Sequence, residues 1–374
     1  MKKFTALLIL LSFSLTQCQK KNEFISQDNL GYKAETVVDG LDIAWGMEFL
    51  PDGSILIAEQ EGKMILFKDG KKTQVKNVPE VMYENQGGLL DLKLHPDYVN
   101  NGWIYFSFSG NVENDDKGSN TTIMRARLKD NELVDKELIY KATPNTKKGH
   151  HFGSRIEFDK DGYLFFSVGD RGNRDVNPQD INRDGGKIYR LHDDGSIPSD
   201  NPFVQTTGAK AAIYSYGHRN PQGMDMNRET GEIWVHEHGP QGGDEINIIK
   251  AGKNYGWPLI TYGINYDGSE ITKDTDLPGM EQPLHFWVPS IAPSGMAFIN
   301  SDRYPGWKGN LLVGSLKFQY LDLVFLENGK VVKEEKLIEG MGRVRTVKEA
   351  PDGYIYVSIE QLGIVKLVPT ASQK

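Results

Sequence analysis

The chain is poor in cysteine and in basic charge, and each shortage excludes a class of protein. Cys18 is the only cysteine among 374 residues, so no disulfide framework can form within the chain. Acidic residues outnumber basic ones by 51 to 43, which gives a formal net charge of −8. Nucleic-acid binding depends on a basic stripe or patch, so this composition argues against a nucleic-acid partner.

Motifs that mark common cofactor and catalytic sites are also missing. The sequence has no Gly-x-Gly-x-x-Gly after a strand, no phosphate-binding loop and no G-x-S-x-G nucleophile elbow. It lacks HExxH as well, and His236 with His238 offers too few ligands for a closed zinc site. We therefore predict no nicotinamide, nucleotide or serine-hydrolase chemistry and no zinc centre.

The N-terminus has the pattern of an export signal. Lys2 and Lys3 precede an apolar run over residues 4–15, and a cleavage zone ending at Cys18 follows. The run has about a dozen residues, whereas a bilayer span takes roughly 20, so no permanent transmembrane helix is expected. Cys18 stands where a bacterial lipoprotein carries its lipid, although Gln17 is atypical there. The alternative is an ordinary signal peptide with an incidental cysteine.

These features predict how the whole chain is organised. Residues 1–18 form a lipoprotein-type signal peptide, residues 19–34 a polar tether and residues 35–374 one domain. A single domain is expected because no Pro- or Ser-rich linker and no charge block divides the remainder. We predict an exported monomer, either periplasmic or anchored to the outer membrane, which touches the membrane only through its lipid.

One repeated pattern determines the predicted architecture. An alternating apolar strand leads into a polar turn, and a second strand rich in aromatic residues follows. The corners are Asp-Gly or similar pairs, which supply the positive φ of a tight turn. The six copies occupy residues 46–53, 90–97, 155–162, 223–231, 295–302 and 344–353, and their second strands residues 54–58, 103–108, 163–168, 232–236, 310–314 and 354–359. With roughly 50–60 residues per copy, we predict an all-β, six-bladed β-propeller with four-stranded antiparallel blades.

A propeller would bring residues that are far apart in sequence to one place. The innermost strand of every blade begins at the same end of the channel, so the residues before each repeat should converge in a polar funnel. Each also has an ordinary interpretation: a lone histidine is usually structural, alternating arginines are usually solvated or ion-paired, and Asn-Pro is typical of a turn. Their recurrence favours a site, because clustered cations need an anion. The residues are Asp42, Gln86, His151, Arg219, Asn220, Ser290, Arg343 and Arg345.

These stretches resemble a known family. The chain is similar to the soluble sugar dehydrogenases that depend on pyrroloquinoline quinone (PQQ), within the glucose/sorbosone dehydrogenase family, and specifically to the aldose sugar dehydrogenase branch. The resemblance extends over about residues 41–366, and the family also contains eukaryotic propellers that bind protein partners. Its most specific segments are Gln-Gly-Gly-Leu-Leu-Asp at 86–91, His-Phe-Gly-Ser-Arg at 151–155, Gly-His-Arg-Asn-Pro-Gln-Gly at 217–223, Asp-Glu-Ile-Asn at 244–247, Asn-Tyr-Gly-Trp-Pro at 254–258, Ser-Leu-Lys at 315–317 and Arg-Val-Arg at 343–345.

The resemblance implies a cofactor site in the funnel. PQQ carries three carboxylates and an ortho-quinone, so its binding calls for arginine forks and lysine charge. Two amide side chains would add neutral hydrogen bonds and a tyrosine an aromatic wall. The implied PQQ-binding residues are Gln86, Arg219, Asn220, Tyr266, Lys317, Arg343 and Arg345.

Two calcium sites are implied as well. At the first, the main-chain carbonyls of Gly239 and Pro240 would hold Ca²⁺ against the cofactor, where it acts as a Lewis acid. At the second, Glu245 and the carbonyl of Tyr255 match the positions of a structural Ca²⁺. The alternative for the second site is that the acids at 244–245 only cap a turn.

The implied reaction is the oxidation of an aldose at C1 to its lactone. Neutral His151 would take the proton of the anomeric hydroxyl as general base while hydride leaves C1 for the quinone. Arg219 would lie near the charge that develops on the quinone. Residues 163–186 are expected over the funnel mouth, where they would shape access of the sugar. The electrons would then pass to an acceptor that the sequence does not identify.

Two other functions remain open from the sequence. A Ca²⁺-dependent lactonase-type hydrolase would need side-chain carboxylates and amides around an axial metal, whereas Asp42 is the only acid expected in this cationic funnel. A non-catalytic binding propeller would not need the set formed by His151, Arg219, Asn220 and the two arginines at 343 and 345.

Overall fold

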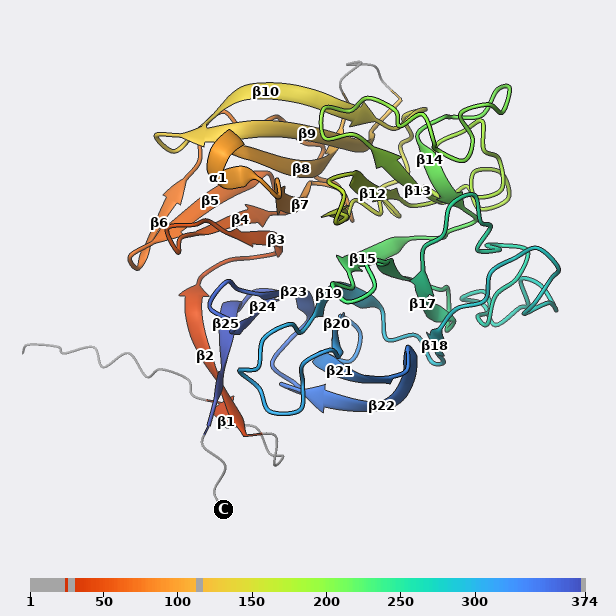
Figure 1. Ribbon diagram of the computed structural model, residues 1–374. Helices are drawn as coiled ribbons and strands as arrows, with labels where there is room; N and C mark the ends of the chain where they lie inside the picture. Colours follow the sequence, from red (N-terminus) through yellow and green to blue (C-terminus); the bar gives the residue numbers. More distant parts are fainter. Residues whose placement is uncertain (1–23, 26–30, 112–116, 371–374) are drawn as a thin grey trace, which may run out of the picture.

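Six antiparallel sheets surround a central axis in the computed structural model of the protein (Figure 1). The structure describes residues 24–25, 31–111 and 117–370. Five sheets have four strands and the sixth has five. The predicted six-bladed β-propeller with four-stranded antiparallel blades is confirmed, and one short strand is added to the last blade.

The first five blades follow one another along the chain. Each starts with its inner strand at the channel and proceeds outwards. Blade 1 contains β3 (Ala44–Phe49), β4 (Ile55–Glu59), β5 (Lys63–Lys68) and β6 (Lys71–Gln74); blade 2 contains β7 (Leu89–Leu94), β8 (Trp103–Gly110), β9 (Asn120–Lys129) and β10 (Glu132–Lys141); blade 3 contains β11 (Ile156–Phe158), β12 (Leu164–Val168), β13 (Lys187–Leu191) and β14 (Ile213–Tyr216); blade 4 contains β15 (Pro221–Met226), β16 (Ile233–Glu237), β17 (Asp244–Ile248) and β18 (His285–Trp287); blade 5 contains β19 (Pro293–Phe298), β20 (Leu311–Ser315), β21 (Tyr320–Glu327) and β22 (Lys330–Leu337).

The last blade is built from both ends of the chain. It contains β23 (Val344–Glu349), β24 (Ile355–Ile359) and β25 (Gly363–Pro369), to which β2 (Tyr32–Asp39) and then β1 (Phe24–Ile25) are added. Figure 1 shows β2 beside β25 at the edge of the ring. β2 therefore starts inside the stretch predicted as tether, and the folded domain begins before residue 35. The predicted signal peptide and Cys18 lie outside the described residues.

The repeats correspond to the inner two strands of each blade. The second strand of each blade begins within one residue of its predicted start and is buried at every position. Burying a large apolar side chain contributes about 1.5–3 kcal/mol, so these strands stabilise the packing between blades. The corner glycines Gly53, Gly162 and Gly353 have φ of 82°, 83° and 77°, as the Asp-Gly corners predict.

The described residues contain a single helix. α1 (Tyr98–Asn101) has four residues and lies between β7 and β8. Within the described ranges, no helix is long and apolar enough to cross a membrane.

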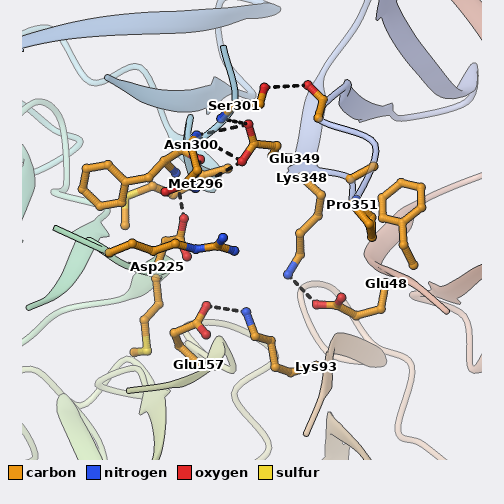
Figure 2. Close-up of a pocket in the computed structure, with 17 residues that line it drawn as sticks. Glu48, Lys93, Glu157, Asp225, Met296, Asn300, Ser301, Lys348, Glu349 and Pro351 are labelled. Carbon is orange, nitrogen blue, oxygen red and sulfur yellow. Dashed lines mark hydrogen bonds and ion pairs between the residues drawn. The ribbon is translucent and has the colours of Figure 1, made fainter. Parts of the chain in front are cut away.

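The inner strands enclose a channel with a cavity at each end. Each inner strand contacts the inner strands of both neighbouring blades, which closes the ring. The cavity at the starts of these strands measures about 390 Å³ and is called the funnel cavity below. The cavity at their ends measures about 560 Å³ and is called the distal cavity (Figure 2). The charged residues that line the distal cavity are Glu48, Lys93, Glu157, Asp225, Arg228, Lys348 and Glu349.

Arg155 lies in the channel next to the funnel cavity. Its side chain is buried, and Nε donates to the carbonyl of Gln222 over 2.6 Å. Nη1 donates to Oδ1 of Asp91 over 3.2 Å, and the guanidinium lies 4.0 Å from the centre of the Trp45 ring. Burial lowers the pKa of Arg155, whereas the charge of Asp91 raises it. Arg155 therefore contacts two residues that line the funnel cavity, Gln222 and Trp45, without lining it itself.

Candidate active site

The funnel cavity collects several of the residues that precede the repeats. Its volume is in the range of small-molecule sites. Gln86, Arg343 and Arg345 line it directly, and His151 adjoins the lining residue Phe152. The complete lining consists of Ile43, Trp45, Gln60, Asn85, Gln86, Leu90, Phe152, Gly153, Gln222, His238, Ala292, Leu316, Arg343, Arg345 and Glu360.

His151 is held from both its main chain and its ring. Its φ is 57°, a conformation that is uncommon for a residue other than glycine, and its N–H donates to Oε1 of Gln86 over 2.8 Å. Its Nδ1 lies 2.6 Å from Oδ1 of Asp170, whose Oδ2 accepts a 2.9 Å bond from Nε1 of Trp257. The carboxylate requires the proton on Nδ1, so Nε2 is left as the acceptor of the ring.

The electrostatics of this pair suit a neutral base. Burial lowers the pKa of His151 to about 4, although the hydrogen bond with Asp170 opposes the shift. For Asp170, burial disfavours the ionised form, but the bond from His151 and the charge of Arg219 outweigh it and lower its pKa. At neutral pH the site therefore contains an imidazole beside a carboxylate, which is the arrangement of an oriented general base.

Arg219 and Asn220 are fixed beside this pair. The N–H of Arg219 donates to Oε2 of Glu237 over 2.6 Å, and its Nη1 donates to the carbonyl of His238 over 3.1 Å. Oδ1 of Asn220 accepts the N–H of Gly153 over 3.1 Å, two residues after His151. Nε of Arg219 and Nδ2 of Asn220 are buried and have no hydrogen-bond partner within the described part of the chain.

Arg343 and Arg345 share a carboxylate that the sequence analysis did not identify. Nε of Arg343 lies 2.7 Å from Oε2 of Glu360, and Nε of Arg345 lies 2.9 Å from Oε1. Burial lowers the pKa of Arg345, whereas Glu360 raises it. The expectation that Asp42 is the only acid of the funnel is wrong, because Glu360 lines the cavity and Asp42 is an exposed residue outside it. The two arginines still outnumber their one carboxylate.

The loop after β16 carries the residues predicted for the first calcium site. Gly239 and Pro240 are buried there, and the N–H of Gly239 donates to Oδ1 of Asp244 over 2.8 Å. Asp244 also accepts from Ser290 Oγ and from the N–H groups of Ile291 and Ala292, at distances of 2.7 to 3.0 Å. Its carboxylate therefore fastens the loop of Gly239 to the segment before β19, whose Ala292 lines the funnel cavity.

A second, smaller cavity adjoins Arg219 and is called the acidic cavity below. It measures about 10 Å³, room for about one water-sized sphere. Glu245 and Tyr255, the residues predicted for a structural Ca²⁺, both line it, and so does Glu237. Burial and the charge of Glu237 raise the pKa of Glu245 to about 8. A buried and a half-buried carboxyl group at one cavity favour a cation, and Ca²⁺ prefers such oxygen ligands.

Comparison with known proteins assigns the chain to a family. Residues 41–366 match the family described as glucose/sorbosone dehydrogenase. The chain belongs to this family. It is 42% identical to the aldose sugar dehydrogenase YliI of Escherichia coli over 335 residues, which cover 87% of this chain and 90% of that protein.

Solved structures agree with this assignment. The apo-form of the soluble aldose sugar dehydrogenase from E. coli has a TM-score of 0.85 at 39% identity, and the match covers 90% of this chain and 99% of that one. The PQQ-bound form of aldose sugar dehydrogenase from Streptomyces coelicolor has a TM-score of 0.74 at 28% identity, covering 91% and 98%. The resemblance to glucose/sorbosone dehydrogenases, stated above from the motifs, is confirmed.

Of the other residues predicted at the funnel, His151, Arg219 and Asn220 contact lining residues without lining the cavity themselves. Tyr266, Lys317 and Ser290, like Asp42, are not brought to it. Tyr266 is 77% exposed and does not line it. Lys317 is exposed next to the lining residue Leu316, with Nζ 5.1 Å from the centre of the Phe318 ring. Ser290 is buried, but its hydroxyl is bonded to Asp244 instead of facing the cavity. Tyr266 and Lys317 follow β17 and β20, so the repeats do not determine where they lie. Ser290 precedes the inner strand β19, but its hydroxyl is engaged by Asp244.

Residues 163–186 do not form a single cover over the funnel. Residues 164–168 are β12, a buried blade strand, and Asp170 follows it directly to reach His151. Asp170 was missed because this segment was expected only to shape sugar access. Its position just after a blade strand, in Gly-Asp-Arg-Gly at 169–172, was the available signal.

His236 and His238 differ in their surroundings. His236 is buried with neither ring nitrogen partnered among the described residues, and burial lowers its pKa to about 3. Nε2 of His238 lies 2.5 Å from the carbonyl of Pro293. The described ranges contain no group of three or more His, Cys, Asp or Glu side chains that could hold a metal. Both predicted calcium sites would therefore depend on main-chain carbonyls.

Proposed function

We propose that the protein oxidises aldose sugars at C1 to lactones, with PQQ bound in the funnel cavity and His151 as general base. Membership of the glucose/sorbosone dehydrogenase family supports sugar oxidation. The PQQ-bound relative from S. coelicolor supports the choice of cofactor.

The observation that carries the proposal is the pair of buried donors without acceptors. Nε of Arg219 and Nδ2 of Asn220 lack partners within the described residues. A buried, unpaired donor costs about 1–3 kcal/mol, so a bound group with acceptor oxygens would be favoured beside them. Arg343 and Arg345 add two charges against the single carboxylate of Glu360. This donor set fits the carboxylates and quinone oxygens of PQQ.

His151 would move the proton. Asp170 keeps the proton of the ring on Nδ1, and Nε2 takes the proton of the anomeric hydroxyl. The positive φ of His151 and its main-chain bond to Gln86 fix where the ring lies, which keeps the base in place before the sugar arrives. PQQ, when bound, supplies the electrophilic carbon that accepts hydride from C1.

Gly239 and Pro240 would hold Ca²⁺ through their carbonyls beside the cofactor, where this hard cation acts as a Lewis acid. Asp244 orients the peptide of Gly239 through its N–H. Glu245, Glu237 and the carbonyl of Tyr255 would hold a second Ca²⁺ at the acidic cavity. Electrons would leave for an acceptor that is not identified.

Reconstitution tests this function. The purified apo-protein should reduce a dye in the presence of aldoses only after PQQ and Ca²⁺ are both supplied. Activity with NAD in place of PQQ would contradict the proposal, and so would hydrolysis of lactones without a sugar oxidation step. The last result would favour the lactonase alternative. Tight PQQ binding without turnover on any aldose would favour a binding propeller.

We further propose that the chain is an exported monomer that carries lipid at Cys18. Lys2, Lys3 and the apolar run over residues 4–15 support export. A cysteine at the end of this run supports lipidation, and the several acyl chains of a bacterial lipoprotein would make anchoring stable.

A further inference from the structure

Both carboxylate oxygens of Glu237 accept hydrogen bonds, from two residues that are consecutive in the sequence. This buried side chain belongs to the last residue of β16. Nδ1 of His218 lies 2.8 Å from Oε1, and the N–H of Arg219 donates to Oε2 over 2.6 Å. Charge-assisted bonds of this kind are about twice as strong as neutral ones. The carboxylate thus fixes the main chain at the point where Arg219 leaves it.

His218 extends this contact on its far side. It is fully buried, its Nε2 lies 2.9 Å from Oγ of Ser215, and its ring stacks on Tyr255 at 4.5 Å. Because Nδ1 donates to the carboxylate, Nε2 accepts from the hydroxyl. Serine, histidine and glutamate in this order resemble a hydrolase triad, but Ser215 is fully buried and no substrate can reach it. The set therefore has a supporting role.

The same carboxylate faces the acidic cavity. Glu237 and Glu245 both line it, and Nδ2 of Asn247 lies 3.3 Å from an oxygen of the first and 3.2 Å from an oxygen of the second. Within the described residues, Glu245 accepts from Asn247 and not from the segment of Arg219, so the two acids share the cavity but only Glu237 reaches Arg219.

We propose that Glu237 is a positioning residue for Arg219 and links the acidic cavity to the funnel. The inference rests on the proposed function, in which the unpartnered Nε of Arg219 faces the cofactor. Displacing a group at a reacting centre by about 1 Å can cost about 100-fold in rate. The proposed role is geometric, because the hydrogen bond from the N–H of Arg219 determines where the guanidinium lies. The negative charge that Glu237 adds to the acidic cavity would contribute separately to cation binding there.

Three variants separate the positioning of Arg219 from the charge of the acidic cavity. Glu237→Ala removes both acceptors. Glu245→Ala is the matched control, since it removes the other carboxylate of the cavity without touching His218 or Arg219. Glu237→Gln loses the charge but keeps the shape: its carbonyl can accept from the N–H of Arg219, and its amide can donate to Nδ1 of His218 once that ring exchanges its proton to Nε2.

Two measurements on the apo-protein give readouts besides activity. Hydrogen exchange of the amide of Arg219 should become about 10-fold faster or more in Glu237→Ala and stay near wild type in Glu237→Gln and Glu245→Ala. Binding of Tb³⁺, followed by energy transfer from Tyr255 and Trp257 at the cavity, should weaken in all three variants.

With PQQ and Ca²⁺ at saturating concentration, kcat should fall about 10–100-fold in Glu237→Ala, with KM for the sugar little changed. In Glu237→Gln most of the lost kcat should be recovered, although Tb³⁺ binding stays weak. Wild-type kcat and exchange in Glu237→Ala would overturn the proposal. So would equally fast exchange of the Arg219 amide in Glu245→Ala, or a failure of Glu237→Gln to recover kcat, because both results would place the effect on the charge of the cavity.

If Glu237→Ala does not fold, Glu237→Asp takes its place. It keeps the charge, but a carboxylate withdrawn by one methylene cannot reach both donors, so the same faster exchange is expected. If the wild type shows no PQQ-dependent turnover, the proposed function fails by itself. Exchange at Arg219 still decides whether Glu237 holds this segment.

Discussion

The two ends of the channel carry similar residues but balance their charges differently. At the funnel end, Arg343 and Arg345 share the one carboxylate of Glu360. At the distal end each lysine has its own acid, with Lys93 2.6 Å from Glu157 and Lys348 2.6 Å from Glu48 (Figure 2).

The other acids of the distal cavity are also satisfied. Glu349 accepts from the N–H groups of Asn300 and Ser301, and Asp225 accepts the N–H of Phe298 over 2.7 Å (Figure 2). Paired charges at equivalent positions of neighbouring blades stabilise a ring, whereas excess cations and unpartnered donors require a ligand. Volume alone would point to the wrong end, because the distal cavity is the larger.

The largest effect that separates the two ends is expected at His151. His151→Ala removes the proposed base, and loss of general-base catalysis typically lowers the rate about 10²–10⁴-fold. PQQ should still bind, since the arginines remain. Steady-state kinetics with a titration of PQQ absorbance checks both. If the variant loses only PQQ affinity and keeps kcat, His151 is a binding residue and the assigned mechanism is wrong.

The next effect concerns the stability of the distal end. Lys93→Met leaves Glu157 unpaired in a site where the two side chains are 20% and 7% exposed. Breaking a buried pair in this way costs about 3–5 kcal/mol in the free energy of unfolding, which denaturant titration measures. The double variant Lys93→Met with Glu157→Leu is the control and should recover most of the loss. A lowered PQQ affinity in the folded variant would show that the ion pairs of the distal cavity also affect the PQQ site.

A smaller effect on affinity is expected at the funnel end. Arg343→Ala removes a charge-assisted contact worth about 1.5–3 kcal/mol, so PQQ affinity should fall about 10–150-fold. Lys348→Ala, its counterpart at the distal end, should leave that affinity unchanged. Isothermal titration with PQQ and Ca²⁺ checks the pair, and equal losses in both variants would show that the effect is global.

The pH dependence sharpens the assignment of the base. Burial lowers the pKa of His151 to about 4. A general base must be neutral, so kcat/KM should rise as pH increases through about 4 and level off above it. An unperturbed histidine would put this limb near about 6.5. A limb near that value, unchanged in Asp170→Asn, would assign the titration to another group.

The smallest effect on activity is expected at the N-terminus. Cys18→Ser should release the protein from the membrane fraction or leave it unprocessed, while the folded domain keeps its dye-linked activity, because Cys18 precedes every described strand. Fractionation with N-terminal sequencing checks this. Wild-type protein that is wholly soluble with another N-terminus would contradict lipidation and leave export intact.

The repeats made the fold and part of the site predictable. A residue just before an inner strand has its position set by the ring, which is why Gln86, Arg343 and Arg345 line the funnel cavity as expected. His151 and Asn220 also approach one another, through Gly153.

The rest depended on contacts that no local pattern determines. Glu360 follows β24 and meets arginines 15 and 17 residues away, and Asp170 reaches His151 from the end of another strand. Tyr266 lies in the long loop between β17 and β18, whose course depends on its own turns. Both carboxylates lie just after the second strand of a blade, whereas the repeat pattern determines only the residues that precede the inner strands.

β2, the strand that joins the N-terminal part of the chain to the last blade, also determines from which side the chain enters the propeller. β2 begins opposite Pro369 and ends opposite Gly363, close to the funnel residue Glu360. The chain therefore enters the propeller on the distal side. If Cys18 carries lipid as proposed above, the anchored segment would join the propeller at that face, which is opposite to the funnel opening. Sugar would then arrive from the open compartment. An acceptor embedded in that membrane would be separated from the funnel by the depth of a blade, roughly 20 Å for a six-residue strand. Under the lipidation proposed above, this arrangement would suit an acceptor that reaches the outward face by diffusion.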